Sequence, residues 1–294
     1  MDGEFALELI NRQAYLDPAA DALQQGIHAT FEAAGDAGQK VKDALHGTWL
    51  GHPVHATITD VPVGAWTAAL ALDALDEMTG RREFASGADA AIAVGLAGAV
   101  GAAVTGLTDW SDTDGRARKA GLVHGLLNLT SAGLYGASLI CRSQRKRNTG
   151  RGLAALGYAL AFVSAWIGGE LVYKERVGIN HSGDVAGEPA EWTPVLAENE
   201  LEEHQPKRAL AKEFPIMLLR REGRIYALGA ACPHAGGPLD EGEISGHTVT
   251  CPWHGSTFDL SSGGIVNGPS VYDVPCFDTR VLNGQIEVRR AARR

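Results

Sequence analysis

The chain has 294 residues, enough for about two domains of ordinary size. Hydrophobic residues make up 45% of it, which excludes a wholly disordered or fibrous chain. The formal net charge is −9, and no part of the sequence is strongly basic. We therefore expect no nucleic-acid partner, because such a partner needs Lys and Arg to neutralise its phosphates.

The first 58 residues form a polar segment in which two amphipathic helices are expected, beginning near Pro18 and Gly35. No apolar run followed by a small-residue cleavage site occurs there, so a secretory signal is not expected. We predict a polar N-terminal tail over residues 1–58.

Four apolar runs follow, at residues 61–75, 90–108, 121–141 and 152–169. The first is the weakest because Asp73 interrupts it. A helix that crosses about 30 Å of hydrocarbon needs about 20 apolar residues. A soluble Ala-rich bundle is the alternative, but its helices would carry a charged stripe, which these runs lack. We predict an all-α four-helix transmembrane bundle over residues 59–178.

A linker at residues 179–190 leads to a region of short β-type runs that begins near Trp192. Residues 221–223 lie between two such runs, and Asn283-Gly284 lies between two others. Both are hairpin signals. We predict an all-β domain over residues 191–292, and hence a multidomain chain.

Two short loops of this β domain carry a mixed set of metal ligands. Cys232-Pro233-His234 is followed, after sixteen residues, by Cys251-Pro252-Trp253-His254. Two thiolates and two imidazoles can hold zinc or an iron–sulfur cluster. A zinc finger usually groups its cysteines on one knuckle and its histidines on a helix, whereas each loop here brings one of each. The spacing favours the cluster and leaves structural zinc as the alternative.

This arrangement resembles the Rieske family, in which two cysteines bind one iron of a [2Fe–2S] cluster and two histidines bind the other. Gly255-Ser256 and Gly268-Pro269 extend the resemblance, the latter as a loop that shields the cluster. The resemblance implies four metal ligands: Cys232, His234, Cys251 and His254. The cysteines would hold the inner iron and the histidines the solvent-facing iron, where the electron would leave. Three residues beside the cluster are also implied: Ser256, Trp253 and Pro269.

Departures from the quinol-oxidising members of that family concern a disulfide and a tyrosine. The positions matching the disulfide hold Gly237 and Trp253, and Phe258 replaces the tyrosine. Ser256 remains and is expected to donate a hydrogen bond toward a bridging sulfide. The resemblance therefore implies a low or intermediate potential, closer to the soluble Rieske ferredoxins. No G-x-G-x-x-G follows a strand, so electrons are expected to come from and pass to other molecules.

The helical region resembles an uncharacterised bacterial family of membrane domains, which implies a fold but no activity. The matching stretches are residues 51–55, 60–64, 121–124 with Asn128, and 168–173. In an up-down bundle, polar residues of these stretches would gather at the membrane face from which the β domain hangs. Ionisable groups at such places tend to be functional. The residues concerned are His52, His55, Asp60, His124, Asn128 and Glu170.

Three interpretations of this polar face remain open. His52 or His55 could join His124 in binding a haem b or another metal. Alternatively, His52, His55 and Asp60 could form a 2-His-1-carboxylate iron site. The favoured interpretation is interhelical hydrogen bonds and caps that line a quinone or docking surface. The remaining cysteines, Cys141 and Cys276, are expected to be packed thiols.

Basic residues are nearly balanced between the two membrane faces. Arg81, Arg82 and the basic residues of 142–151 load the loops opposite the β domain, and residues 116–119 and 174–176 load its own side. No twin-arginine export signal is present. We therefore predict that the β domain faces the cytoplasm of a bacterial-type cell.

We expect a multi-pass membrane protein that carries single electrons at the membrane surface, with redox proteins or the quinone pool as donor and acceptor. One alternative is a membrane oxidoreductase, an enzyme whose helices bind haem or quinone and complete a reaction. Another is a redox-sensing Rieske domain on a passive helical anchor.

Overall fold

The computed structural model describes residues 3–183 and 187–291 and shows a helical unit followed by an all-β unit, as predicted. The helical unit comprises residues 1–38 and 53–177, and the β unit comprises residues 39–52 and 178–294. Part of the segment expected as a polar tail, residues 39–52, is therefore part of the β unit. The chain passes between the two units three times.

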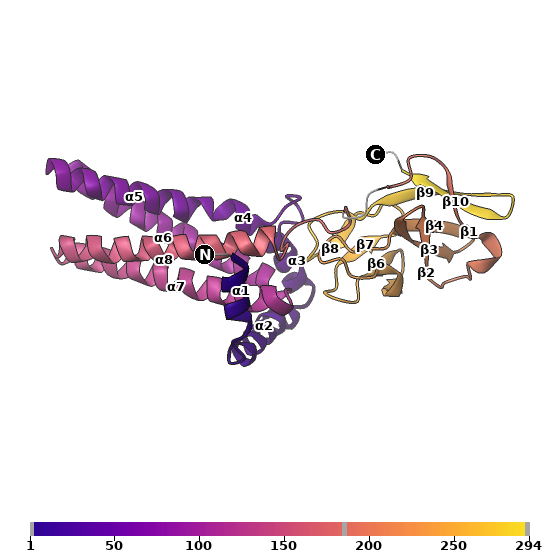
Figure 1. The fold of residues 1–294 in the computed structure, drawn as a ribbon, viewed down its shortest axis with the longest axis horizontal. Coiled ribbons are helices and arrows are strands. Elements are labelled where there is room, and N and C mark those ends of the chain that lie inside the picture. The colour runs from indigo at the N-terminus through magenta and orange to yellow at the C-terminus, as the bar shows by residue number, and fades with distance from the viewer. Residues whose placement is uncertain (1–2, 184–186, 292–294) are drawn as a thin grey trace. The chain divides into compact units, whose positions relative to one another are not determined.

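Four long helices lie alongside one another in the helical unit (Figure 1). α5 packs mainly on α6, and α7 mainly on α8. Within the described residues, the helices are α1 (Gly3–Asn11), α2 (Leu16–Ala33), α3 (Gly35–His46), α4 (Val54–Ile58), α5 (Asp60–Thr79), α6 (Arg82–Ser111), α7 (Gly115–Ser143) and α8 (Arg147–Tyr173). The last residues of α3 belong to the β unit.

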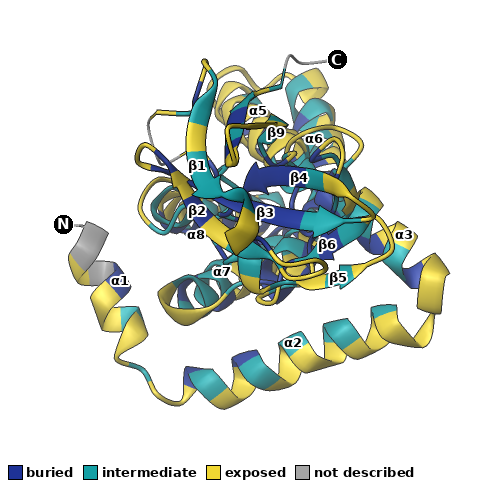
Figure 2. Ribbon diagram, turned by 90° about the vertical axis from the view of Figure 1, so that its right-hand side faces the viewer, coloured by how far each residue is buried: buried dark blue, intermediate teal, exposed yellow. Residues whose placement is uncertain are grey.

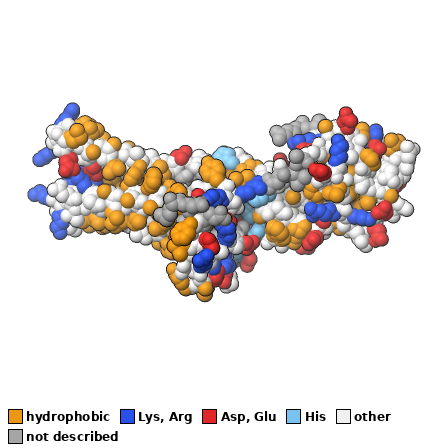
Figure 3. Space-filling model, in the orientation of Figure 1, with side chains coloured by type: hydrophobic (Ala, Val, Ile, Leu, Met, Phe, Trp, Pro, Cys, Tyr) orange, Lys and Arg blue, Asp and Glu red, His pale blue; other side chains and the backbone are white. Residues whose placement is uncertain are grey.

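Three helical segments of the described chain are long and apolar enough to cross a membrane: Val54–Thr79, Arg82–Ser111 and Arg147–Tyr173. Hydrophobic side chains cover much of the visible flank of the long helices (Figure 3). The fourth long helix, α7, is not among the three, and it carries polar residues such as His124 and Asn128. Of the four predicted spans, three therefore meet the length and composition of a membrane-crossing helix. The fourth, α7, does not meet them but is the fourth long helix of the bundle.

Small residues allow the long helices to approach closely. A Cβ added at Gly95 would lie 2.2 Å from the indole nitrogen of Trp66, so only glycine fits there. The Trp66 ring stacks on that of Tyr135 with centroids 4.1 Å apart. The Ser131 hydroxyl donates to the carbonyl of Gly157 at 2.7 Å. Backbone proximity and interhelical hydrogen bonds of this kind hold helices together in lipid.

A network of buried ion pairs joins the four long helices at one end, near the charged tips in Figure 3. The Arg142 side chain is only 2% exposed. Its guanidinium donates to Asp73 at 2.8 Å and to Asp89 at 2.9 Å. The network consists of Asp73, Asp76, Asp89, Arg142, Arg147 and Arg151. From the sequence, these arginines are expected in the loops opposite the β domain. In the structure they form ion pairs between the helices.

Helix α2 is one of the two predicted amphipathic helices, and α3 is the other. Arg118, near the start of α7, donates to Asp17 of α2 at 2.8 Å, and Gln24 of α2 donates to the carbonyl of Trp110 at 3.0 Å. Most of α2 is otherwise exposed (Figure 2). The helix is thus fastened at the junction of α6 and α7.

The β unit consists of two antiparallel sheets in the described chain. A six-stranded sheet has the order β1-β10-β9-β4-β3-β2, and a four-stranded sheet has the order β5-β6-β7-β8. The strands of the first are β1 (Thr193–Ala197), β2 (Lys207–Ala211), β3 (Phe214–Arg221), β4 (Arg224–Gly229), β9 (Cys276–Leu282) and β10 (Gln285–Arg290). Those of the second are β5 (Glu243–Ser245), β6 (Thr248–Thr250), β7 (Thr257–Asp259) and β8 (Ile265–Asn267).

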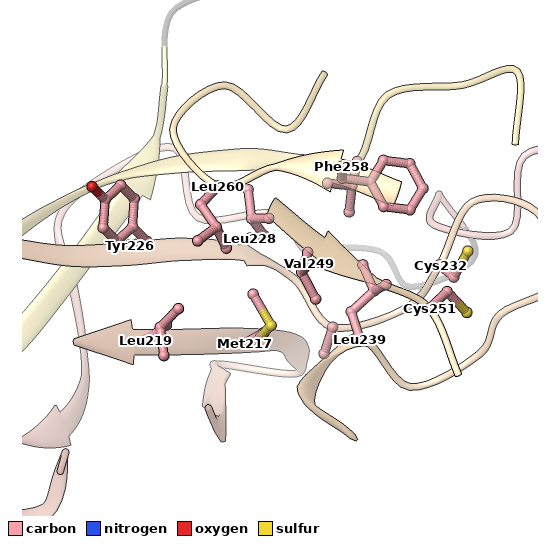
Figure 4. Packing of buried hydrophobic residues seen from close by; sticks show 12 residues of the cluster. Met217, Leu219, Tyr226, Leu228, Cys232, Leu239, Val249, Cys251, Phe258 and Leu260 are labelled. Carbon is pink, nitrogen blue, oxygen red and sulfur yellow. The ribbon is translucent and has the colours of Figure 1, made fainter. Parts of the chain in front are cut away.

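Both predicted hairpins are confirmed. Arg221 pairs with Arg224, and Leu282 pairs with Gln285, so each loop has two residues. Both residues of the Asn283-Gly284 loop have positive φ, at 54° and 75°, as a type I′ turn requires. Strands β3 and β4 are largely buried (Figure 2). Their inward side chains pack with those of the smaller sheet in one hydrophobic cluster (Figure 4).

Candidate metal centre

In each of the two ligand-bearing loops, a glycine amide is hydrogen-bonded to the carbonyl of the cysteine four residues earlier. Cys232 lies shortly after β4, and its carbonyl accepts the amide of Gly236 at 2.8 Å. Cys251 directly follows β6, and its carbonyl accepts the amide of Gly255 at 3.1 Å. Both glycines have positive φ, at 79° and 78°, a conformation that most other residues avoid. Each loop therefore closes on its cysteine in the same way, although the histidine follows the cysteine by two residues in the first loop and by three in the second.

The two cysteines lie at one end of the hydrophobic cluster (Figure 4). Cys232 is 1% exposed and Cys251 is 3% exposed. The hydrogen bond between them, together with burial, raises the pKa of Cys232, whereas the same bond lowers the pKa of Cys251 to about 6. The two sulfur atoms are thus adjacent and hydrogen-bonded to each other, and a bound metal would replace the proton between them.

The two histidines form a second pair. The rings of His234 and His254 have centroids 4.9 Å apart and are nearly perpendicular. Both residues are half-buried, unlike the cysteines. The loops therefore offer a buried pair of sulfur donors and a more exposed pair of ring nitrogens.

This pairing fits a two-iron cluster better than a single zinc ion. A structural zinc needs four protein donors around one point. In the described chain, no group of three or more His, Cys, Asp or Glu side chains is placed to hold one metal ion. In a Rieske cluster each iron takes only two protein ligands, either two Cys or two His. Two separate pairs of donors are what that geometry requires.

Ser256 lies beside the first cysteine. Its side chain is fully buried, and its hydroxyl is hydrogen-bonded to the Cys232 sulfur, which acts to lower the pKa of that thiol. It also accepts the amide of Ser270 at 3.0 Å. The hydrogen bond from Ser256 toward a bridging sulfide stays a prediction. The structure shows one to the cysteine sulfur.

The two positions at which the resemblance places a disulfide in quinol-oxidising Rieske proteins, Gly237 and Trp253, are in tight contact here. A Cβ added at Gly237 would lie 2.8 Å from the Cys251 sulfur and 3.0 Å from the Trp253 ring. The Trp253 side chain is 56% exposed. Phe258 is fully buried in the core. Close contact at Gly237 thus joins the two loops.

In the helical unit the structure brings together three of the polar residues singled out from the sequence. The rings of His55 and His124 have centroids 6.5 Å apart. His55 donates from Nδ1 to the carbonyl of Ala102 at 2.9 Å, and His124 donates from Nδ1 to the carbonyl of Ser164 at 2.8 Å. Asn128 donates to Nε2 of His124 at 3.1 Å. These contacts are hydrogen bonds between helices and within α7.

The other residues of the predicted polar face have different places. Glu170 forms an ion pair with Lys174 at 2.7 Å. Asp60 is the first residue of α5, and His52 belongs to the β unit. Among the described residues, His52, His55 and Asp60 do not form a group placed to hold one metal ion. Cys141 and Cys276 form no disulfide, and each is partly buried.

Comparison with known proteins agrees with this site. The family described as Rieske [2Fe-2S] domain matches residues 191–278, and the family described as Predicted membrane protein (DUF2231) matches residues 51–181. The ferredoxin subunit of anthranilate 1,2-dioxygenase from Burkholderia cepacia is 31% identical over 99 residues, which are 34% of this chain and 92% of that protein.

Two further relatives resemble only the β unit or part of it. Apoptosis-inducing factor 3 of Mus musculus is 34% identical over 74 residues, 25% of this chain, and the chain spans only 12% of its length. The solved ferredoxin of carbazole 1,9a-dioxygenase from Nocardioides aromaticivorans has 25% identity and a TM-score of 0.32, and it covers 34% of this chain and 98% of its own.

The β unit with its paired cysteines and histidines defines an iron–sulfur protein. Through this domain, the chain belongs to the Rieske family, which implies a [2Fe–2S] cluster. A membrane-type domain of unknown activity precedes it.

Proposed function

We propose that the chain is a membrane-bound carrier of single electrons, with Cys232, Cys251, His234 and His254 as the ligands of its cluster. The observation that supports this most strongly is the separation of the four donors into a sulfur pair and an imidazole pair. The cluster, when bound, supplies reversible one-electron chemistry. The protein's own residues bury one side of it and leave the other accessible.

The direction of electron exit follows from burial. The cysteines lie against the hydrophobic core, whereas the histidines are half-buried and the neighbouring Trp253 is exposed. Electron transfer to a partner requires close approach, so the histidine side is where a donor or an acceptor would dock. We propose redox proteins as these partners, since the similar Burkholderia cepacia protein is the ferredoxin subunit of a dioxygenase.

A second cofactor is not part of this proposal. The hydrogen bonds of His55 and His124 account for those side chains, and no comparison supports a haem or a quinone. The helical unit is therefore proposed to act as a membrane anchor. Cytoplasmic placement of the β unit stays a prediction.

The proposed function is tested by anaerobic reductive titration of the detergent-purified full chain. We expect uptake of one electron per chain, accompanied by an EPR signal that is absent from the oxidised protein. Reoxidation by a one-electron acceptor should abolish the signal. A protein that takes up no electron, or that takes up two electrons without an EPR signal, would contradict the proposal.

Replacing Ser256 by alanine is expected to lower the reduction potential of the cluster by tens of millivolts. The hydroxyl stabilises negative charge on the Cys232 sulfur, and that charge increases on reduction. A hydrogen bond worth about 1 kcal/mol corresponds to roughly 40 mV for a one-electron couple. Potentiometric titration of Ser256→Ala measures the shift. The control Ser245→Ala, at an exposed site in β5, should keep the wild-type potential.

A further inference from the structure

The loop that carries Gly268 and Pro269 follows β8 and is attached to the cysteine site. The amide of Ser270 donates to the hydroxyl of Ser256, which is also hydrogen-bonded to the Cys232 sulfur. Ser270 is 1% exposed. We refer to residues 268–272 as the shielding loop, because the proposed function places it beside the cluster.

A distant segment of the chain holds the first residue of this loop. The amide of Gly268 donates to the Asp43 carboxylate at 2.8 Å, across 225 positions of sequence. A Cβ added at Gly268 would lie 3.3 Å from the methyl group of Thr48 and 3.5 Å from the ring of His46. Residues 39–52 thus pack directly on the shielding loop.

Asp43 is itself held in place for this contact. Gln39, one turn earlier in α3, donates to the same carboxylate oxygen at 2.8 Å. The Asp43 carbonyl accepts the amides of Gly47 at 3.1 Å and Thr48 at 3.2 Å, which ends the helix. Gly47 has a φ of 94°, a conformation suited to glycine. Gln39 and the end of the helix therefore hold the Asp43 carboxylate in the position where it accepts the Gly268 amide.

A second segment holds the other end of the shielding loop and one ligand loop. The Tyr272 hydroxyl donates to the carbonyl of Gly178 at 3.0 Å. Three residues later, the amide of His181 donates to the carbonyl of Pro233 at 3.0 Å. Pro233 lies between the ligands Cys232 and His234. Residues 178–182 therefore contact two of the loops around the proposed cluster.

We propose that residues 39–52 and 178–182, which we call the connectors, are positioning elements of the cluster site. They act through two hydrogen bonds to the shielding loop, one from the Gly268 amide to Asp43 and one from the Tyr272 hydroxyl to the carbonyl of Gly178. This inference rests on the proposed function. Both connectors lie outside residues 191–278, the part that matches the Rieske family, so the family domain alone does not supply these contacts. Both are also segments through which the β unit is joined to the rest of the chain.

The proposal predicts that loosening a connector exposes the cluster without unfolding the domain. Asp43→Ala removes the acceptor of the Gly268 amide, whereas Asp43→Asn keeps an oxygen that can accept it. Tyr272→Phe removes only the hydroxyl. The matched controls are Asp36→Ala, exposed on the same helix, and Tyr173→Phe, whose side chain is 84% exposed.

The measurements are hydrogen exchange of the peptide that covers the shielding loop and the rate of iron loss to a chelator, both on the full chain in detergent. In Asp43→Ala we expect loop exchange about tenfold faster, because a hydrogen bond to a charged acceptor is lost. Iron loss should also accelerate. Tyr272→Phe should act in the same direction and Asp43→Asn less strongly. Peptides of β3 should exchange as in the wild type, which verifies the fold.

Wild-type rates of loop exchange and iron loss in both Asp43→Ala and Tyr272→Phe, in protein that shows the cluster EPR signal, would overturn the inference. Faster loop exchange with an unchanged rate of iron loss would also overturn it, because the connectors would then be structural only. A wild-type chain without the signal would instead refute the proposed function. Faster hydrogen exchange of the β3 peptides than in the wild type would show general unfolding and would count against a positioning role.

Discussion

Replacement of Cys232 or Cys251 by serine is expected to remove the cluster from the purified full chain entirely. Each cysteine supplies one of two sulfur donors on the same proposed iron, and a serine oxygen is a poor substitute for a thiolate in an iron–sulfur site. Iron content and the EPR signal of the reduced protein should both fall to background. The domain should also become less stable, since metal binding contributes to folding.

The chain offers its own controls for this experiment, because its other two cysteines, Cys141 and Cys276, lie outside the proposed site and form no disulfide. Cys141→Ser and Cys276→Ser should retain the wild-type iron content and EPR signal. Loss of the signal in Cys276→Ser together with its retention in Cys232→Ser would show that the ligand assignment is wrong.

Replacement of Arg142 by leucine is expected to destabilise the helical unit by about 3–5 kcal/mol. This guanidinium is the least exposed member of the ion-pair network, and its loss removes a partner from Asp73, whose side chain is only 8% exposed. Breaking a buried pair costs more than the pair itself contributes, because the remaining charge stays desolvated. The melting temperature and the yield of monodisperse protein in detergent measure the effect.

A double variant separates charge balance from side-chain packing. Asp73→Leu together with Arg142→Leu leaves two aspartates opposite two arginines, so most of the lost stability should return. The control Lys146→Leu, at an exposed site nearby, should melt like the wild type. A wild-type melting temperature in Arg142→Leu would show that the network does not stabilise the bundle.

Local signals in the sequence predict much of this fold. Asn283-Gly284 marks its hairpin because few other residue pairs adopt positive φ at two successive positions. The two ligand loops, Cys-Pro-His and Cys-Pro-Trp-His, carry their own turn glycines, so hydrogen bonds within each loop hold its backbone. The family resemblance noted from the same residues is confirmed by the comparisons.

Contacts between distant segments are what the sequence does not show. Asp43 lies in a helical stretch of ordinary polar composition, and nothing near it indicates a partner at Gly268. In the sequence, Asp73 is visible only as a charge that interrupts an apolar run. Its pairing with Arg142 depends on how two separate helices are rotated toward each other, which no local signal shows. Residues 39–52, expected as part of the N-terminal tail, group with the β unit through tertiary contacts of the same kind.

The most direct test of the central claim is the analysis of iron, zinc and acid-labile sulfide in the purified full chain, combined with EPR of the reduced sample. The account predicts two irons and two sulfides per chain, as one [2Fe–2S] cluster requires, and an EPR signal that appears only on reduction. One zinc per chain, with neither iron nor sulfide, would contradict it.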